Sequence, residues 1–362
     1  MTAEIEALPI DRPRPHAGRW RSRVAVRALG ALAWLLSRLP DRPLHRLAQS
    51  AGVLLYLVWP RRRALVRANL ARVCRWLAEH ELASPRVAAA AHDGRALNAL
   101  VRGAFGHYLR TYLENLIVER YARDGMAERI TADDPALVER AFTGLADGRG
   151  TIFVGLHFGA IEIPALWTVR RGVALTSPME ALDDPALQAF MLHRRSLTGM
   201  HLIPTDGAGR ELGGRLAAGE AVALVADRPV AGAGARVELF GAPARLPLGP
   251  AVLALESGAP VWAVAIRRSG AGAYRGRMEP IALPASGTRR ERLAGFLAAE
   301  ARTFERLIAD APEQWWTLFF PIWSASDRPD EPATARPAGF ARSGAAGDRE
   351  GEAASDRPDG AA

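Results

Sequence analysis

Cysteine and lysine are the residue types that this 362-residue chain nearly or entirely lacks. The single cysteine, Cys74, excludes an intramolecular disulfide framework and any zinc site made of several cysteines. Because lysine is absent, all 47 basic residues are arginine, and the phosphate-binding loop that needs Gly-Lys-Ser/Thr is excluded. The chain also lacks the Gly-x-Ser-x-Gly elbow and the His-Glu-x-x-His zinc motif. We expect no metal site, since the eight histidines show no ligand-like spacing with acids.

Long apolar runs are missing as well. The two richest stretches are residues 24–36, which Arg27 interrupts, and residues 51–59, which stop at Pro60. Neither reaches the roughly 20 apolar residues that a helix needs to cross a bilayer. A hydrophobic content of 49%, a charged content of 24% and a mean hydropathy of −0.03 exclude wholesale disorder, a collagen-like repeat and a polytopic membrane protein.

The positive charge is concentrated near the N-terminus. From Arg12 to Arg75, fifteen arginines stand against one acid, Asp41, while the whole chain carries a net charge of only +8. The remainder of the chain is therefore acidic on balance. A sequence pI near 10.6 is typical of nucleic-acid-binding proteins, but these arginines are interleaved with aliphatic runs rather than gathered on a polar face. This patterning favours an anionic membrane surface over a nucleic acid as the partner.

The two apolar stretches predict a pair of N-terminal helices. Both are bracketed by arginine and carry tryptophan, and the prolines of residues 40–43 predict a turn between them. Tryptophan prefers the membrane interface, and each arginine near anionic headgroups contributes about 1 kcal/mol. We interpret the pair as a helical hairpin that lies in the cytoplasmic leaflet. Two buried packing helices are the alternative, and a single tilted span over residues 24–39 is disfavoured by Arg27 and Arg38.

The pattern of apolar residues changes at about residue 150. Residues 61–145 show the three- and four-residue spacing that is typical of helices. Beyond them, apolar runs of strand length alternate with helical segments, which indicates an α/β fold whose sheet is covered on both faces. The expected strands are residues 151–156, 173–176, 201–204, 221–226, 237–240 and 261–266.

Three regions follow from this pattern. Residues 1–60 form the basic N-terminal segment with the interfacial hairpin, and their first part shows no cleavable signal peptide. Residues 61–324 form the folded domain. Residues 325–362 contain one large apolar side chain, Phe340, so we expect a disordered tail.

The most informative local motif is His157 at the end of a buried apolar run, followed by Gly159 and Glu162. In doubly wound sheets, ligands bind at the carboxyl ends of strands, so a catalytic histidine is expected there. Glycine permits a turn that would bring Glu162 to the imidazole, and a carboxylate on Nδ1 leaves Nε2 free to take a proton. In the alternative interpretation, His157 caps a helix and Glu162 is a first-turn acid favoured by the helix dipole.

A second buried run delivers Asp227 and Arg228. If its strand is parallel to the first, Asp227 emerges at the same sheet edge as His157 and is an alternative or additional partner for it. Arg228 could bind a phosphate or pair with Asp227 at the surface. Arg194 and Arg195, on a predicted helix, could clamp a phosphate bidentately, although a solvated basic face is the commoner explanation.

These residues resemble the bacterial lipid A biosynthesis acyltransferase family over roughly residues 61–323. His157 and Glu162 fall on its H-x4-[D/E] signature, and Arg194 or Arg195 falls on its arginine helix. The other matching elements, in chain order, are an R-x-N-L element at residues 67–70, an F…E helix at 105–114, an acidic strand end at 227–228, an F-F-G-x-P…P-x-G-x-A run at 239–251 and a closing P-E-Q-[Y/W] element at 312–316.

The resemblance implies a glycerolipid acyltransferase-like mixed sheet flanked by helices, with an N-terminal membrane-associating helical segment. It implies transfer of a fatty acyl group from acyl-CoA or acyl carrier protein to a hydroxyl of a membrane glycolipid, without a metal or a further cofactor. His157 would act as general base, with Glu162 and Asp227 as its partners. The residues implied in substrate binding are Gly159, Arg194, Arg195 and Arg228. The apolar positions of residues 95–120 fit either an acyl channel or core packing.

Two departures from the family pattern bear on the acceptor. Ala160 and Ile161 replace the usual Asn and Trp of the histidine motif, and residues 319–323 (FFPIW) replace the basic ending of the lipid A enzymes. This ending is closer to the phosphatidylinositol mannoside acyltransferase branch. We expect a peripheral or monotopic monomer on the cytoplasmic face of the inner membrane. A catalytically inactive membrane scaffold of the same fold is the alternative, against which the intact histidine and acids argue.

Overall fold

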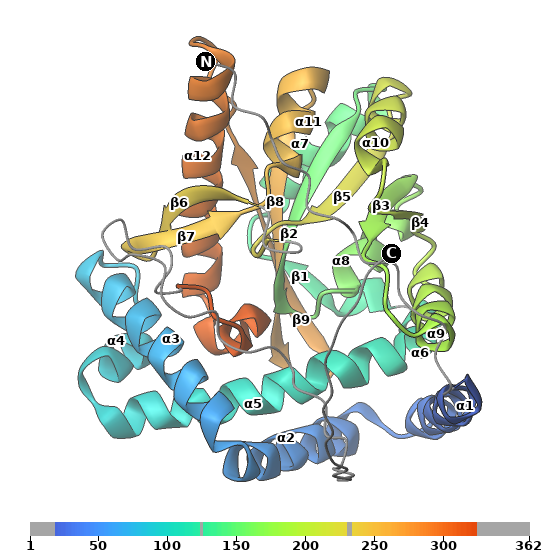
Figure 1. Ribbon diagram of the computed structural model, residues 1–362, viewed down its shortest axis with the longest axis vertical. Helices are drawn as coiled ribbons and strands as arrows, with labels where there is room; N and C mark the ends of the chain where they lie inside the picture. The colour runs from blue at the N-terminus through green and yellow to red at the C-terminus, as the bar shows by residue number, and fades with distance from the viewer. Residues whose placement is uncertain (1–18, 124–125, 230–233, 324–362) are drawn as a thin grey trace, which may run out of the picture.

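The computed structural model describes residues 19–123, 126–229 and 234–323, and its centre is a seven-stranded sheet (Figure 1). The strand order is β1-β9-β8-β2-β5-β3-β4. The strands from β8 to β4 run parallel to one another, whereas β9 and β1 run antiparallel to them. The sheet strands are β1 (Ile130–Ala132), β2 (Thr151–Gly159), β3 (Leu175–Met179), β4 (His201–Pro204), β5 (Ala221–Val225), β8 (Val261–Gly270) and β9 (Ala273–Ile281), and β6 (Ala235–Leu239) with β7 (Ala242–Leu246) forms a separate antiparallel hairpin.

Strand β2 shows why the sheet is covered on both faces. Its side chains alternate between two apolar clusters, with Ile152 and Val154 in one and Phe153 in the other. The first cluster includes side chains from α10 (Ala208–Ala217), α11 (Gly249–Ser257) and α12 (Arg289–Ala309), and the second includes side chains from α7 (Pro135–Ala146) and α8 (Ile163–Arg170). Strand β2 is therefore buried on both faces of the sheet.

Helices from the N-terminal third of the chain lie across the end of the sheet (Figure 1). Helix α5 reaches the carboxyl end of β2, where Thr111 Oγ1 donates to the carbonyl of Gly159 at 3.4 Å. The remaining helices are α1 (Arg19–Leu36), α2 (Asp41–Val58), α3 (Pro60–Glu79), α4 (Pro85–His92), α5 (Gly94–Leu116), α6 (Val118–Arg123) and α9 (Pro185–Ser196), with 3-10 turns η1 (Met126–Arg129), η2 (Pro312–Gln314) and η3 (Trp316–Phe319).

Helices α1 and α2 occupy the two predicted apolar stretches but do not form the expected hairpin. Helix α1 packs mainly on α9, whereas α2 packs along α5. Helices α2 and α5 approach each other closely at two glycines. A Cβ added to Gly52 would lie only 2.5 Å from the Cα of Gly106. The two helices are nevertheless not buried all round, since Trp34 and Leu54 are each 61% exposed. No helix in the described ranges is long and apolar enough to span a membrane.

The predicted class, a mixed α/β sheet flanked by helices, is confirmed. The predicted strand at residues 237–240 belongs to the β6–β7 hairpin rather than to the sheet, and β1 and β9 were not predicted. Strand β9 was not predicted because arginines and a glutamate separate its apolar residues, so its sequence does not resemble that of a buried strand. The predictions for residues 1–18 and for the tail at 325–362 lie outside the described residues.

Candidate active site

Strand β2 is bent where it presents His157. The pairing of β2 with β8 changes register between Gly155 and Gly159, an irregularity that re-aims the intervening side chains. Gly159 has a φ of 57°, and a Cβ at this position would collide with the carbonyl oxygen of Ile266. Only glycine fits such a site without strain. As a result, the His157 side chain stands at the mouth of a cleft and is 20% exposed.

His157 is paired with Asp227. The parallel neighbours β2 and β5 end at the same sheet edge, and Asp227 follows β5 by two residues. The distance between His157 Nδ1 and Asp227 Oδ1 is 2.6 Å. Since an ionised carboxylate can only accept hydrogen bonds, Nδ1 carries a proton, and in the neutral ring Nε2 then presents a lone pair. This arrangement makes the ring competent to take a proton from a bound hydroxyl.

Asp227 is itself buried and fully hydrogen-bonded. Its second oxygen, Oδ2, accepts from Trp315 Nε1 at 2.7 Å and from Thr317 Oγ1 at 2.6 Å. Burial alone would raise the pKa of this carboxyl. The facing imidazole and the three hydrogen bonds outweigh burial and lower the pKa of Asp227 to about 2. The carboxylate is therefore ionised at neutral pH.

Glu162, the other expected partner, does not hydrogen-bond to His157. It lies just before α8 and is buried, and its Oε1 accepts from Asn115 Nδ2 at 3.1 Å and from Arg195 Nε at 2.9 Å. The turn after Gly159 carries the carboxylate toward α5 and α9 rather than back to the imidazole. Glu162 thus joins three elements at the edge of the cleft, and of the two carboxylates expected beside His157 only Asp227 is hydrogen-bonded to it.

The predicted arginines separate into two groups. Consecutive residues on a helix point about 100° apart, so only one of Arg194 and Arg195 can face the cleft. Arg195 and Arg228 line it, and Arg228 Nη2 lies 3.4 Å from Glu180 Oε2. Arg194 instead is buried against α5 and α6, where it donates to the carbonyl of Leu116. The expectation that Arg194 contacts substrate is therefore wrong.

The cleft around His157 is lined by a mixture of aliphatic, aromatic and polar side chains. It has a volume of about 1440 Å³, including the part open to solvent. The Trp316 ring lies 5.2 Å from the His157 ring at an interplanar angle of 27°, and Tyr112 lines the cleft nearby. Among the residues that the structure describes, no group of three or more His, Cys, Asp and Glu side chains could hold a metal ion.

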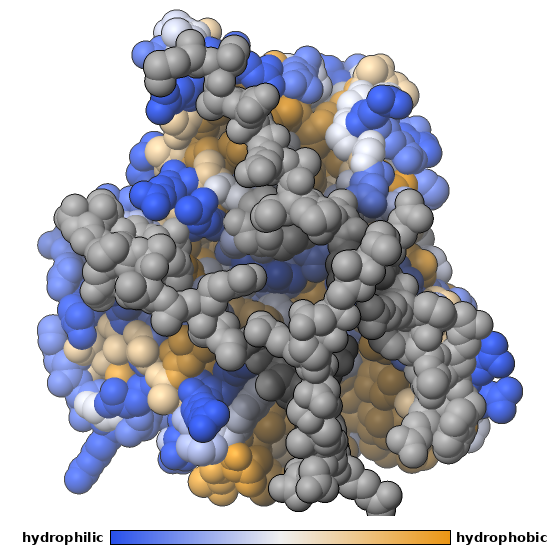
Figure 2. Space-filling view, viewed as in Figure 1, coloured by the Kyte–Doolittle hydropathy of each residue, from blue (hydrophilic) through white to orange (hydrophobic). Residues whose placement is uncertain are grey.

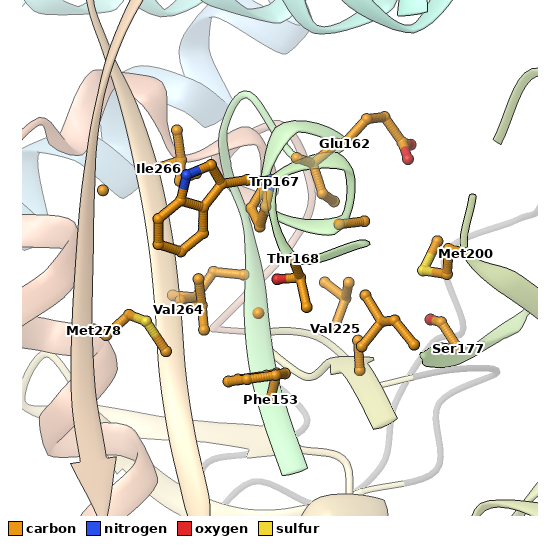
Figure 3. A pocket seen from close by; sticks show the side chains of 18 of the residues that line it. Phe153, Glu162, Trp167, Thr168, Ser177, Met200, Val225, Val264, Ile266 and Met278 are labelled. Atoms are coloured by element: carbon orange, nitrogen blue, oxygen red, sulfur yellow. The ribbon is translucent and has the colours of Figure 1, made fainter. Parts of the chain in front are cut away.

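A second, apolar cavity adjoins this cleft, and we call it the α8 cavity because it lies between α8 and the sheet (Figure 3). Its volume is about 1120 Å³, with the same inclusion of open space. Side chains of the sheet such as Phe153, Val264 and Met278 line it together with Trp167 of α8. The residues that line both the cleft and the α8 cavity are Ile161, Glu162, Pro178, Arg195, Leu224 and Val225.

The α8 cavity does not lie where the sequence allowed an acyl channel. The apolar positions of α5 pack into the core, as Leu97, Val101 and Phe105 show, and no residue of α5 lines the cavity. The structure thus favours core packing for these apolar positions, while Thr111, Tyr112 and Asn115 of the same helix line the cleft.

Three contributors to the site were missed by sequence reasoning: Trp315 and Thr317, which bind Asp227, and Trp316, which flanks His157. The only available signal was the closing P-E-Q-W-W element, to which no role had been given. Its separation from Asp227 by almost 90 residues means that no local spacing rule connects them.

Comparisons with known proteins agree with this geometry. Residues 18–323 match the family described as bacterial lipid A biosynthesis acyltransferase. The phosphatidylinositol mannoside acyltransferase of Mycolicibacterium smegmatis is 28% identical over 236 residues, which cover 64% of this chain and 74% of the relative. The protein of the same name from Mycobacterium tuberculosis H37Rv is 33% identical over 186 residues, which cover 50% of this chain and 57% of the relative.

The histidine–carboxylate pair at a strand end, the adjoining apolar cavity and the family match over most of the chain lead to one assignment. This chain belongs to the bacterial lipid A biosynthesis acyltransferase family and is an acyltransferase of that family.

Proposed function

We propose that this protein transfers a fatty acyl group from a thioester to a hydroxyl of a membrane glycolipid, with His157 as the general base. The observation that carries the proposal is the position of His157, which is paired with Asp227 and lines a cleft that contains charged side chains such as Arg228 and shares one wall with the α8 cavity. A polar acceptor and an apolar chain can therefore meet at the imidazole.

The reaction follows from the hydrogen-bond pattern. His157 Nε2 takes the proton of the acceptor hydroxyl while the hydroxyl oxygen attacks the thioester carbonyl carbon. Asp227, held ionised, stabilises the imidazolium that forms. Collapse of the tetrahedral intermediate breaks the carbon–sulfur bond, and the imidazolium returns the proton to the departing thiolate. Such proton transfer typically contributes about 10²–10⁴-fold to the rate.

The acyl chain of the donor occupies the α8 cavity in this proposal. The cavity is lined mainly by aliphatic and aromatic side chains, and burial of a chain there is worth about 0.8 kcal/mol per CH₂ group. The head of the donor, coenzyme A or acyl carrier protein, stays outside. Arg228, whose side chain is 29% exposed, is placed to meet a phosphate of donor or acceptor.

The acceptor that we propose is a mannosylated phosphatidylinositol. The supporting facts are the names of the two mycobacterial relatives and the FFPIW ending at residues 319–323, which lacks the basic residues of the lipid A enzymes. The wholly apolar Phe319, Phe320 and Ile322 offer no charge to the phosphates of lipid A.

We further propose that α1 and α2 rest on the cytoplasmic surface of the inner membrane. Figure 2 shows apolar residues gathered over α2 at one edge of the molecule. Leu54, Leu57 and Val58 are each about 60% exposed there, and Arg61 follows directly. Exposed leucines next to arginines suit an interface between acyl chains and anionic headgroups.

Purified protein should be given a mass-labelled acyl donor, either acyl-CoA or acyl carrier protein, together with a phosphatidylinositol mannoside or a lipid A precursor. Mass spectrometry should find one added acyl chain on the mannoside with at least one donor. His157→Ala should lower this rate by about 10²–10⁴-fold while circular dichroism remains unchanged. Full activity of the variant would remove His157 from the mechanism, and wild-type protein inert toward every combination would favour the inactive scaffold.

A further inference from the structure

Asn69 of α3 joins the helical layer to the turn beneath the catalytic pair. The side chain is buried, with 6% of its surface exposed. Its amide nitrogen donates to the carbonyl of Leu318 at 2.9 Å and to the carbonyl of Phe320 at 3.0 Å. Both protons of the amide are thus committed to one short stretch of backbone that lies almost 250 residues away in the chain.

A second side chain of the same helix completes this contact. Arg62 donates to the carbonyl of Phe319, the residue between the two that Asn69 holds. Three successive carbonyls are therefore bound by α3. We call residues 315–320 the terminal turn.

The terminal turn needs such external donors. Turn η3 is a 3-10 helix of only four residues, and the carbonyls at the end of a helix have no partner within it. The terminal turn also contacts the active site, where the side chains of Trp315 and Thr317 donate to Asp227 Oδ2. One side of the turn is held by α3, and the other side holds the catalytic carboxylate.

We propose that Asn69 is a positioning residue for the His157–Asp227 pair. By fixing the terminal turn, it fixes the two donors that orient Asp227, so that Oδ1 faces the imidazole. Asn69 touches neither the imidazole nor the cleft, since it is not among the residues that line the cleft. This inference deepens the proposed function. The tests that measure reaction rates rest on the proposed function, whereas the test by NMR spectroscopy does not.

The first test compares Asn69→Ala with Asn98→Ala in the acyl-transfer assay. Asn98 of α5 is the control. Its Oδ1 accepts from Arg67 of α3, the helix that carries Asn69, but Asn98 does not reach the terminal turn. Asn69→Ala should lower kcat by about 10–100-fold with KM for the donor unchanged, as a displaced catalytic group would. Asn98→Ala should retain wild-type kcat. An unchanged kcat in a folded Asn69→Ala protein would overturn the proposal.

The second test asks whether Asn69 acts through the terminal turn. Thr317→Val removes one donor to Asp227, and the effect of Asn69→Ala is then measured again in that background. If Asn69 and Thr317 act through the same carboxylate, adding Asn69→Ala to Thr317→Val should lower kcat by less than about threefold. Multiplicative effects, with the full loss repeated in the Thr317→Val background, would contradict a shared route.

The third test needs no substrate. In protein labelled with ¹⁵N-histidine, the Nδ1 proton that His157 shares with Asp227 should give a downfield resonance that is missing from His157→Gln. Asn69→Ala should shift or broaden this signal, and Asn98→Ala should leave it in place. A signal identical to wild type in Asn69→Ala would overturn the inference even if the protein proved to transfer no acyl group.

If Asn69→Ala does not fold, Arg62→Met supplies the same test, because methionine has no donor for the middle carbonyl at this partly buried site. It should move the His157 signal and kcat in the same direction by a smaller amount. No change in either would count against the proposal.

Discussion

At the scale of single residues, two buried carboxylates near one sheet edge have different partners. Asp227 binds the imidazole and two neutral donors, whereas Glu162 binds an arginine and an amide. In the proposed reaction, the first arrangement would stabilise a charge that forms on His157. The second joins α5, α9 and the start of α8 at the edge of the cleft without a hydrogen bond to the imidazole.

Exchanging each carboxylate for its amide should separate these roles. Asp227→Asn should reduce kcat by about 10²–10⁴-fold, because the imidazolium loses its counter-charge and the ring loses its fixed tautomer. Glu162→Gln should reduce kcat by a smaller factor, since Gln can still accept from Arg195. Steady-state rates of both variants decide the matter, and a larger loss for Glu162→Gln would reassign the partner of His157.

Glu300 of α12 is a buried acid that the proposed reaction does not use. It is fully buried, and neither carboxyl oxygen has a hydrogen-bond partner within the described part of the chain. Burial, and secondarily the charge of Asp227, raise the pKa of Glu300 well above its ordinary value. Glu300 therefore keeps its proton to a higher pH in the folded protein than in the unfolded chain.

Because the pKa of Glu300 is raised on folding, the free energy of unfolding should depend on pH in a defined direction. The folded protein binds one more proton than the unfolded chain, so stability is lost as pH rises above about 4.3, the ordinary pKa of glutamate. Glu300→Gln mimics the neutral acid and should unfold at a higher urea concentration than wild type at pH 7, but not at pH 4. The exposed Glu139→Gln serves as control, and equal gains at both pH values would refute the explanation.

At the scale of elements, α2 packs on α5 through glycines rather than through large side chains. Gly52 approaches the backbone of Gly106 so closely that a methyl group would force the helices apart. Helix α2 is therefore packed on the folded domain, although the sequence placed it in a separate segment ending at residue 60.

Two glycine substitutions test this packing. Gly52→Ala should destabilise the protein by about 1–3 kcal/mol, the usual cost of overpacking. Gly30→Ala in α1, where a Cβ would meet nothing within 4 Å, should be neutral or stabilising by up to about 1 kcal/mol, because alanine favours helix. Thermal unfolding measures both, and equal effects would argue against a tight α2–α5 contact.

Elements differ in how well the sequence predicts them. Strand β4 is predicted to the residue and β5 to within one residue, because their apolar runs contain no arginine or acid, whereas β2 continues three residues beyond its predicted end. From two parallel strands that end at the same edge, the sequence offered Asp227 as an alternative or additional partner of His157 beside Glu162. The role of Trp315 and Thr317 could not be predicted, since it depends on tertiary folding that brings distant segments into contact.

At the scale of the whole molecule, the exposed apolar residues of α2 and the arginines of α2 and α3 lie on the layer that crosses the end of the sheet. The same layer carries α5, which borders the cleft through Thr111, Tyr112 and Asn115. A membrane against α2 would therefore lie on the side of the molecule from which a lipid acceptor reaches His157.

Vesicle binding tests this orientation. The double variant Leu54→Glu, Leu57→Glu should bind anionic vesicles more weakly than wild type, because it places two charges in the apolar contact. Leu82→Glu, which changes an exposed leucine beyond the end of α3, should bind normally. Co-sedimentation at low and high salt gives the comparison, with weaker wild-type binding at high salt. Unchanged binding of the double variant would rule out docking through α2.

The direction of the α8 cavity sets an upper limit on its occupant. The cavity crosses the strands instead of following them, and its lining reaches Leu202 of β4 at one edge of the sheet and Ile130 of β1 at the other. Neighbouring strands are about 4.8 Å apart, so the six steps between the edges of the seven-stranded sheet span about 29 Å. If the cavity holds the acyl chain as proposed, the width of the sheet would limit the length of the fatty acid more than any single side chain would.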